Sequence, residues 1–147
     1  MSTGGMSADP LDLTGKRALV VGGSSGIGNG IAQAYRARGA EVHVWGTRPS
    51  AADYAGEPGS DMTGLAYAQV DVSDPAAIDA APGFDRLDVL VTCQGAVAYR
   101  RAEFEREGWH RVVDVNLHSV MDCARRFRPA LAAAGGSLIV VSSTAAF

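Results

Sequence analysis

The chain has 147 residues, which is enough for one domain with a hydrophobic core. Hydrophobic residues make up 47% of the chain and charged residues 20%, a composition typical of soluble globular proteins. The formal net charge of -3 provides no basic patch for nucleic acid, and no apolar run approaches the length of a membrane span.

Residues 1–10 have neither the charged start nor the apolar segment of a signal peptide. We therefore expect a cytoplasmic protein without nucleic-acid or membrane partners, in which a disordered leader, 1–10, precedes one domain, 11–147. Cys93 and Cys123 form neither a CxxC pair nor a disulfide framework. The three histidines lack metal-ligand spacing, so we predict no metal site.

The first half of the chain alternates apolar runs with one amphipathic segment. Residues 17–21 form a continuous apolar run that predicts a strand buried on both faces. Apolar residues at helical spacing predict a helix over 27–39, which ends at a glycine. A second strand is expected over 41–45, and 49–62 is rich in Pro, Gly, Ser and Asp, which indicates a loop with a turn of helix.

The second half continues the alternation. A third strand is predicted over 65–70, and Ser73-Asp74-Pro75 then begins a short helix that ends near Gly83. Residues 87–91 predict a fourth strand. The long helix that follows has apolar residues three or four positions apart and is limited by Pro129. These apolar residues are Trp109, Val113, Leu117, Val120, Ala124 and Phe127.

A final apolar run predicts strand five over 137–141. Strand and helix thus alternate five times, which is typical of an α/β fold with a parallel sheet wound on both faces. We predict a three-layer Rossmann-type sheet with strand order 3-2-1-4-5. Strand five is then an edge, although its apolar run indicates burial on both faces. Native proteins avoid exposed apolar edges, so we expect a further strand, a partner chain or additional residues to cover it.

A glycine-rich turn follows the first strand with the spacing G-x-x-x-G-x-G. Glycines at such a turn let the backbone approach a pyrophosphate, and the next helix offers unpaired N–H groups and the positive end of its dipole. An ordinary strand-to-helix turn is the alternative. The cofactor-binding residues that we predict here are Gly22, Ser24, Ser25, Gly26, Ile27 and Gly28.

The end of the second strand bears on the choice of dinucleotide. NAD-binding sites of this type carry a carboxylate there, which accepts hydrogen bonds from the adenosine ribose. Here the position is Gly46, followed by Thr47 and Arg48. Because a guanidinium and a hydroxyl suit a 2′-phosphate, NADP is favoured over NAD. A solvated role for Arg48 remains the alternative.

With these motifs in place, the chain resembles the short-chain dehydrogenase/reductase family from Leu13 onward. Gly22, Gly26 and Gly28 match the family's TGxxxGxG loop, although Val21 stands where the family has Thr. The other matching segments are Leu13-Thr14-Gly15-Lys16 before strand one, Asp71-Val72 after strand three, Val113-Asp114-Val115-Asn116-Leu117 on the long helix, and residues 136–143 at strand five.

The resemblance implies roles for these residues. Asp71 and Val72 contact the adenine in the family. Thr92-Cys93-Gln94-Gly95 stands where the family has NNAG, so Cys93, Gln94 and Gly95 are expected to line the nicotinamide-ribose side. Ser143 matches the catalytic serine, which orients and polarises the carbonyl oxygen; a chain-turning role is its alternative. Asn116 matches the active-site Asn that holds a water in the proton relay.

Asn116 also falls on the apolar stripe of its helix, where a buried amide requires partners and a structural hydrogen bond is the alternative role. Cys93 lacks an identifiable base, which favours a small buried residue over a nucleophile.

The family's Tyr-x-x-x-Lys pair is absent. None of the four tyrosines has a lysine four positions later, and the single lysine, Lys16, precedes the glycine turn. A carbonyl reduction needs a proton donor within hydrogen-bond reach. We therefore expect these 147 residues to be inactive alone and to represent the N-terminal part of a longer reductase.

Three functions follow from the sequence. The first is an NADP-preferring oxidoreductase, with NAD possible, that interconverts a small-molecule carbonyl and an alcohol and, like many members of the family, forms a homo-oligomer. The second is a non-catalytic dinucleotide-binding or interaction module. The third, an S-adenosylmethionine-dependent methyltransferase, usually has an acid after strand two for the ribose hydroxyls, and this sequence has none there.

Overall fold

The computed structural model describes residues 9–143, so residues 1–8 of the predicted leader lie outside the described part of the chain. Five parallel strands form one sheet in the order β3-β2-β1-β4-β5, which confirms the predicted topology. The strands are β1 (Arg17–Val21), β2 (Glu41–Gly46), β3 (Ala66–Gln69), β4 (Val89–Thr92) and β5 (Ser137–Val140). The α-helices are α1 (Gly26–Ala37), α2 (Pro75–Ala80), α3 (Arg106–Val113) and α4 (Ser119–Ala134).

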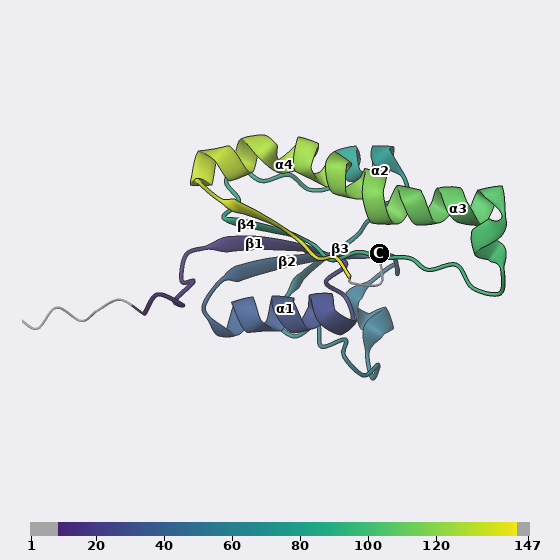
Figure 1. Cartoon of the computed structure of the whole chain (residues 1–147). Helices are drawn as coiled ribbons and strands as arrows, with labels where there is room; N and C mark the ends of the chain where they lie inside the picture. Colours follow the sequence, from purple (N-terminus) through teal and green to yellow (C-terminus); the bar gives the residue numbers. More distant parts are fainter. Residues whose placement is uncertain (1–8, 144–147) are drawn as a thin grey trace, which may run out of the picture.

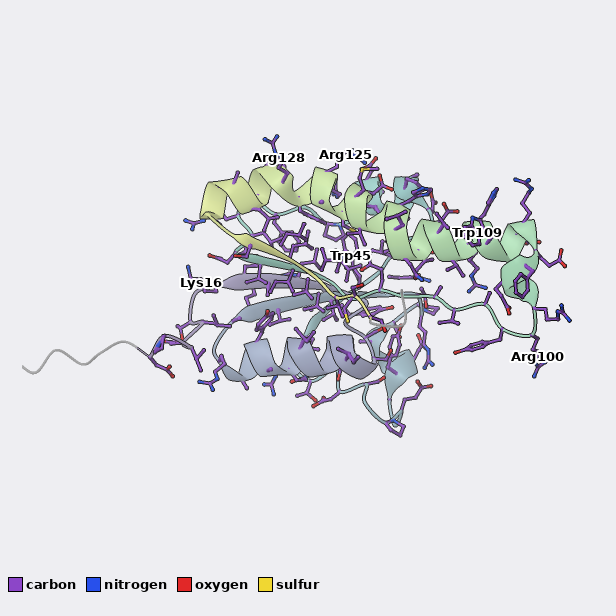
Figure 2. All side chains as sticks on the ribbon, viewed as in Figure 1. Lys16, Trp45, Arg100, Trp109, Arg125 and Arg128 are labelled. Carbon is purple, nitrogen blue, oxygen red and sulfur yellow. The ribbon has the colours of Figure 1, made fainter. Side chains whose placement is uncertain are left out.

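Figure 1 shows three layers, with α1 on one face of the sheet and α2 and α4 on the other. Alternate residues of β1 serve the two interfaces, because side chains of a strand point to opposite faces in turn. Leu19 and Val21 pack in the core beneath α2 and α4, whereas Val20 packs towards α1. Trp45 lies between the sheet and α4, 5.6 Å from the ring of Phe127 (Figure 2).

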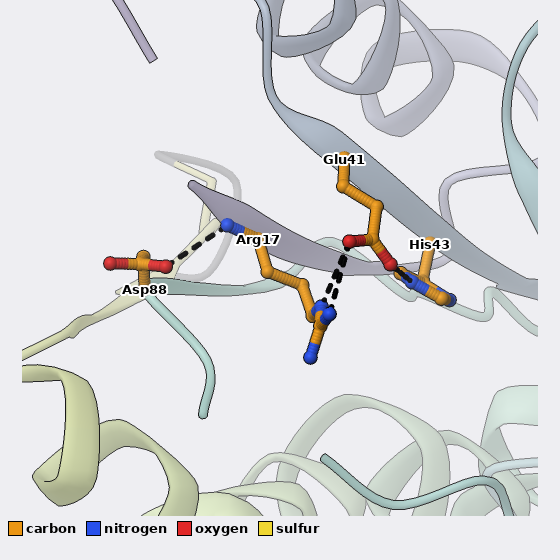
Figure 3. Close-up of polar contacts among 4 residues, drawn as sticks. All are labelled: Arg17, Glu41, His43 and Asp88. Carbon is orange, nitrogen blue, oxygen red and sulfur yellow. Dashed lines mark hydrogen bonds and ion pairs between the residues drawn. The ribbon is translucent and has the colours of Figure 1, made fainter. Parts of the chain in front are cut away.

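The amino ends of three strands are joined by charged side chains (Figure 3). The Asp88 carboxylate accepts a 3.0 Å bond from the Arg17 backbone N–H, which fixes the start of β1 against β4. Arg17 also donates two 3.1 Å bonds to Glu41 at the start of β2, and Glu41 contacts His43 at 2.8 Å. This polar network closes the amino ends of the strands. A ligand site is therefore expected at the carboxyl ends, on the opposite edge of the sheet.

The long helix differs from its prediction in two ways. It is interrupted by a π-helical turn, η3 (Asp114–His118), and it continues through Pro129 to Ala134. Pro129 does not limit the helix because its neighbours Phe127 and Ala130 are buried against the core. Packing there outweighs the hydrogen bond that a proline removes.

The predicted apolar stripe of this helix is buried only in part. Trp109 is 62% exposed and Leu117 63% exposed. Both lie before α4. Trp109 lies on α3, which projects past the ends of the strands in Figures 1 and 2, where the sheet offers no surface to pack against. Apolar spacing predicted the helix correctly but not how far the helix extends beyond its core.

β5 forms the predicted edge of the sheet, and its four residues are all exposed. Leu138 and Ile139 are each 41% exposed and Val140 51%, so no described residue covers this edge. The burial on both faces that the apolar run indicated is therefore not observed. Within residues 9–143, no helix combines the length and the apolar character needed to cross a bilayer.

Candidate cofactor and active site

A cavity of about 970 Å³ opens at the carboxyl ends of β1, β2, β4 and β5. Its walls come from six separate segments: the β1–α1 turn, the end of β2, the residues after each of β3, β4 and β5, and the segment from the end of α3 into η3. All the predicted site residues line it except Gly26 and Arg48. They are Gly22, Ser24, Ser25, Ile27, Gly28, Thr47, Asp71, Val72, Cys93, Gln94, Gly95, Asn116 and Ser143.

The β1–α1 turn requires glycine at two of its positions. Gly22 has a φ of +74°, and a Cβ there would lie 2.8 Å from the backbone of Gln94. A Cβ on Gly28 would collide with the carbonyl oxygen of Gly22. The turn is therefore closed against the residues after β4 and against itself, which leaves its outer side open to a ligand.

The amino end of α1 faces this open side. The first helical hydrogen bond runs from the Asn29 N–H to the Ser25 carbonyl at 3.2 Å, so the preceding amides have no partner inside the helix. The Gly26 amide donates instead to the Gly59 carbonyl at 2.8 Å. The amides of Ile27 and Gly28 remain for an anion, and the first turn contains no acidic residue to compete with it.

Asn29 is a residue of this region that the sequence analysis missed. Its buried amide donates to the carbonyls of Gly23 and Asp61 and accepts from the Asp61 N–H at 3.0 Å. These bonds fold the loop after β2 back onto the glycine turn. An Asn one residue after the last glycine of the turn is the only signal in the sequence, and it does not reveal the partner.

The end of β2 is shaped by hydroxyl groups. A Cβ on Gly46 would lie 2.5 Å from the Tyr54 Oη and 2.6 Å from the Ser24 Oγ, so no side chain fits there. Tyr54 is buried, and its hydroxyl accepts a 3.2 Å bond from the Arg48 N–H. Burial alone raises the pKa of Tyr54, but hydrogen bonds from Ser24, Tyr67 and nearby backbone outweigh it, and the pKa is lowered.

Arg48 turns away from the cavity. Its guanidinium contacts Glu57 at 2.7 Å and donates to the Asp53 carbonyl at 2.5 Å. It also lies 4.6 Å from the centre of the Tyr54 ring. In this conformation Thr47 lines the cavity at the end of β2, and Arg48 does not.

Asp71 lies on the cavity wall at the end of β3. Its Oδ1 accepts bonds of 2.7 Å from the Ser73 hydroxyl and 3.0 Å from the Ser73 N–H. These bonds, followed by the positive charge of Arg111, lower the pKa of Asp71, which is therefore ionised at neutral pH. Arg111 lines the same cavity and was missed by the sequence analysis. The sequence carried no signal for it, because residues five apart on an α-helix such as Arg111 and Asn116 do not share a face.

Two polar residues follow β4. Cys93 is half-buried, and burial raises the pKa of its thiol, so it is no activated nucleophile. Gln94 directs its side chain towards α4, where its Nε2 donates to the Ser119 hydroxyl at 2.8 Å.

Asn116 links the π-helical turn to the loop after β4. Its Oδ1 accepts a 2.7 Å bond from the Ala96 N–H, and its Nδ2 donates to the Ala96 carbonyl at 2.9 Å. Asn116 is exposed and not buried as its place on the apolar stripe indicated, because η3 contains an extra residue per turn and rotates it towards the loop. Its side chain therefore positions the segment after β4.

Ser143 completes the cavity from the β5 side. Pairing with β4 extends beyond β5 through a 3.0 Å bond from the Val141 N–H to the Thr92 carbonyl, which carries Ser142 and Ser143 to the cavity wall. The glycine turn and Ser143 thus line one cavity although they lie at opposite ends of the chain. None of the tyrosines is among the residues described as lining it.

Comparison with known proteins identifies the family to which the chain is similar. The family model for short chain dehydrogenases matches residues 16–147. A 3-oxoacyl-(acyl-carrier-protein) reductase FabG from Chlamydia muridarum is 35% identical, with 89% of this chain and 56% of that protein covered. A D-threitol dehydrogenase from Mycolicibacterium smegmatis is 34% identical, with 91% of this chain and 55% of that protein covered.

Solved structures show the same likeness. A short-chain type dehydrogenase/reductase from Mycobacterium ulcerans superposes with a TM-score of 0.71 at 28% identity and covers 92% of this chain and 54% of its own. The RhlG/NADP active-site complex from Pseudomonas aeruginosa has a TM-score of 0.69 at 28% identity, with 90% and 55% covered. The chain spans about half the length of the relatives that it matches.

Proposed function

The chain belongs to the short-chain dehydrogenase/reductase family. We propose that it is the cofactor-binding part of an NADP-preferring oxidoreductase that interconverts a carbonyl and an alcohol. The observation that carries this proposal is the shared cavity of the glycine turn and Ser143. One end of that cavity suits a diphosphate and the other provides a hydroxyl for a reacting oxygen.

The residues present fit a dinucleotide. Ile27 and Gly28 line the cavity at the amino end of α1, where their amides would hold the diphosphate. Asp71 and Val72 would hold the adenine. A bound nicotinamide cofactor supplies or accepts the hydride.

The preference for NADP is supported by the charge at the end of β2. Asp71 is the one carboxylate among the described residues that line the cavity, and it lies after β3. The space that an acidic side chain at Gly46 needs is filled by the hydroxyls of Tyr54 and Ser24. Arg48 lies two residues after Gly46 and is the cation that would meet a 2′-phosphate.

At the other end of the cavity, the Ser143 hydroxyl would donate a hydrogen bond to the carbonyl oxygen of the substrate as negative charge develops on that oxygen. Asn116 would hold the segment after β4 in place through its two bonds to Ala96, so it is a positioning residue. The proton for the oxygen has no identified donor in these 147 residues, because no Tyr-x-x-x-Lys pair is present. We therefore propose that they bind the cofactor without turning over substrate.

The same absence favours a second candidate, a non-catalytic dinucleotide-binding module. The two candidates differ in the polypeptide found in the source organism. An intact mass larger than that of 147 residues, with a tyrosine and a lysine in the sequence of the segment after Phe147, supports the oxidoreductase. An intact mass that matches 147 residues supports the binding module.

The proposed function is tested by titrating NADPH and NADH into the 147-residue protein and following fluorescence energy transfer from tryptophan. We expect saturable binding of both with tighter binding of NADPH, and no NADPH oxidation with a panel of aldehydes and ketones. Tighter binding of NADH would contradict the proposed preference. Turnover by these residues alone would contradict the proposed need for a further proton donor.

A further inference from the structure

The guanidinium of Arg48 is held by several groups at once. Its Nη2 contacts both carboxylate oxygens of Glu57, at 2.7 and 2.9 Å, and its Nη1 donates to the Asp53 carbonyl at 2.5 Å. The same group lies over the Tyr54 ring at 4.6 Å. Hydrogen bonding to Glu57 raises the pKa of Arg48, so the guanidinium keeps its positive charge.

The surrounding loop builds this arrangement. The backbone of Arg48 is fixed on both sides, because its N–H donates to Tyr54 and its carbonyl accepts a 2.5 Å bond from Tyr67. Asp53 belongs to a 3₁₀ turn, η1 (Ala51–Tyr54), which is capped by bonds from the Ser50 N–H and hydroxyl to the Asp53 carboxylate. The partners of Arg48 are therefore positioned by the fold.

This geometry has a consequence for the charge at the end of β2. The positive charge of Arg48 is offset by a carboxylate nine positions later, which belongs to a segment that does not line the cavity. A phosphate at the end of β2 can bind the guanidinium in two ways. Either Arg48 breaks its ion pair with Glu57, or the phosphate binds beside the Glu57 carboxylate and is repelled by it. Both alternatives cost free energy that an unphosphorylated ribose does not incur.

We infer that Glu57 is a specificity-determining residue that competes with the 2′-phosphate of NADP for Arg48 and so narrows the preference for NADP over NAD. The inference rests on the proposed function and refines its cofactor preference. The relevant chemistry is competition between a carboxylate and a phosphate monoester for one guanidinium.

The test compares dissociation constants for NADPH and NADH in the unmodified protein, Glu57→Gln, Arg48→Gln and the double variant. We expect Glu57→Gln to bind NADPH about fivefold more tightly, which corresponds to about 1 kcal/mol, with NADH binding unchanged. In the Arg48→Gln background, Glu57→Gln is expected to give no gain, because the competition acts through the guanidinium.

Asp79→Asn is the matched control. Asp79 also forms an exposed ion pair with an arginine, Arg125, at 2.7 Å, and it lies on α2 away from the cavity. Its neutralisation removes the same charge and is expected to leave both dissociation constants unchanged. Circular dichroism melting curves of all variants confirm that each one folds.

Three outcomes would overturn the inference. A gain in NADPH binding of equal size with and without Arg48 would show general repulsion by Glu57 and no competition. Weaker NADPH binding in Glu57→Gln would show that Glu57 orients Arg48 for the phosphate. Failure of the unmodified protein to bind either dinucleotide would contradict the proposed function itself, and the inference with it.

Discussion

Gly28 illustrates how one missing side chain shapes the site. A Cβ at this position collides with the Gly22 carbonyl, so Gly28→Ala must displace the β1–α1 turn. We expect a loss of about 1–3 kcal/mol in the free energy of unfolding, typical of overpacking, together with weaker NADPH binding. Urea denaturation and a fluorescence titration measure the two effects.

Gly30→Ala is the control for this substitution. Gly30 lies in the same helix, but a Cβ there meets nothing within 4 Å. An alanine is expected to raise the free energy of unfolding by about 0.5–1 kcal/mol, because alanine favours the helix interior. Equal destabilisation by both variants would contradict the role assigned to the turn.

Cys93 provides a chemical probe of the cavity. Because burial raises the pKa of its thiol, less thiolate is present at pH 8 than in an exposed cysteine, and we expect slow alkylation by iodoacetamide. The rate should rise with pH through a midpoint above the ordinary thiol value and should fall when NADPH is bound. Mass spectrometry of the labelled peptide measures both dependences.

The second cysteine serves as the internal comparison. Burial raises the pKa of Cys123 to about 12, and the residue lies on α4 and is buried in the core. Cys123 should remain unlabelled at every pH at which the protein stays folded. Labelling of Cys93 that is insensitive to NADPH would place the cofactor elsewhere.

Predictions from the sequence were least complete for contacts between individual side chains. The sequence predicted most of the residues that line the cavity, because glycines at a turn and polar groups after strands have local causes. It did not predict that Glu57 neutralises Arg48 or that Asn29 holds the loop after β2. Both contacts depend on how a loop rich in Gly and Pro folds back, which no periodicity encodes.

At the scale of elements, the π-helical turn η3 is the connection most open to test. Asn116→Ala removes both hydrogen bonds to Ala96, and we expect a loss of about 1–2 kcal/mol in the free energy of unfolding. The Ala96 amide should also exchange its hydrogen faster. Urea denaturation and hydrogen exchange followed by NMR measure these changes.

His118→Ala provides a comparison within the same turn. His118 contacts Asp114 at the surface and has no bond to the loop after β4. It should leave the exchange of the Ala96 amide unchanged. If Asn116→Ala also leaves that exchange unchanged, the turn does not position the loop.

Element existence and order were predictable because burial and alternation leave a clear pattern in the sequence. All five strands lie where the apolar runs indicated, within two residues at each end. The exposed Trp109 and the continuation of α4 through Pro129 were not predictable. They depend on where the core ends, which is a property of the assembled layers and not of the helix sequence.

At the scale of the whole molecule, the prediction concerns the β5 edge, which no residue among 9–143 covers. Exposed apolar edge strands favour pairing with another chain, so we expect the 147-residue protein to self-associate with increasing concentration. Val140→Lys should reduce that association, because a charged residue at an edge opposes pairing. Sedimentation velocity over a range of concentrations measures the effect.

Leu11→Lys is the matched control, since Leu11 is 57% exposed but precedes the sheet. It should leave the association unchanged. Association that persists in Val140→Lys, or that is reduced equally by both variants, would show that the β5 edge is not responsible.

The central claim is that the glycine turn binds the diphosphate of a dinucleotide whose other end lies beside Ser143 in the same cavity. An NMR titration of the ¹⁵N-labelled protein with NADPH tests it most directly, because it reports on both ends of the cavity at once. We expect saturable shifts, with one dissociation constant, for the amides of Ile27, Gly28, Gly95 and Ser143. Shifts confined to one end of the cavity, or located outside it, would contradict the account.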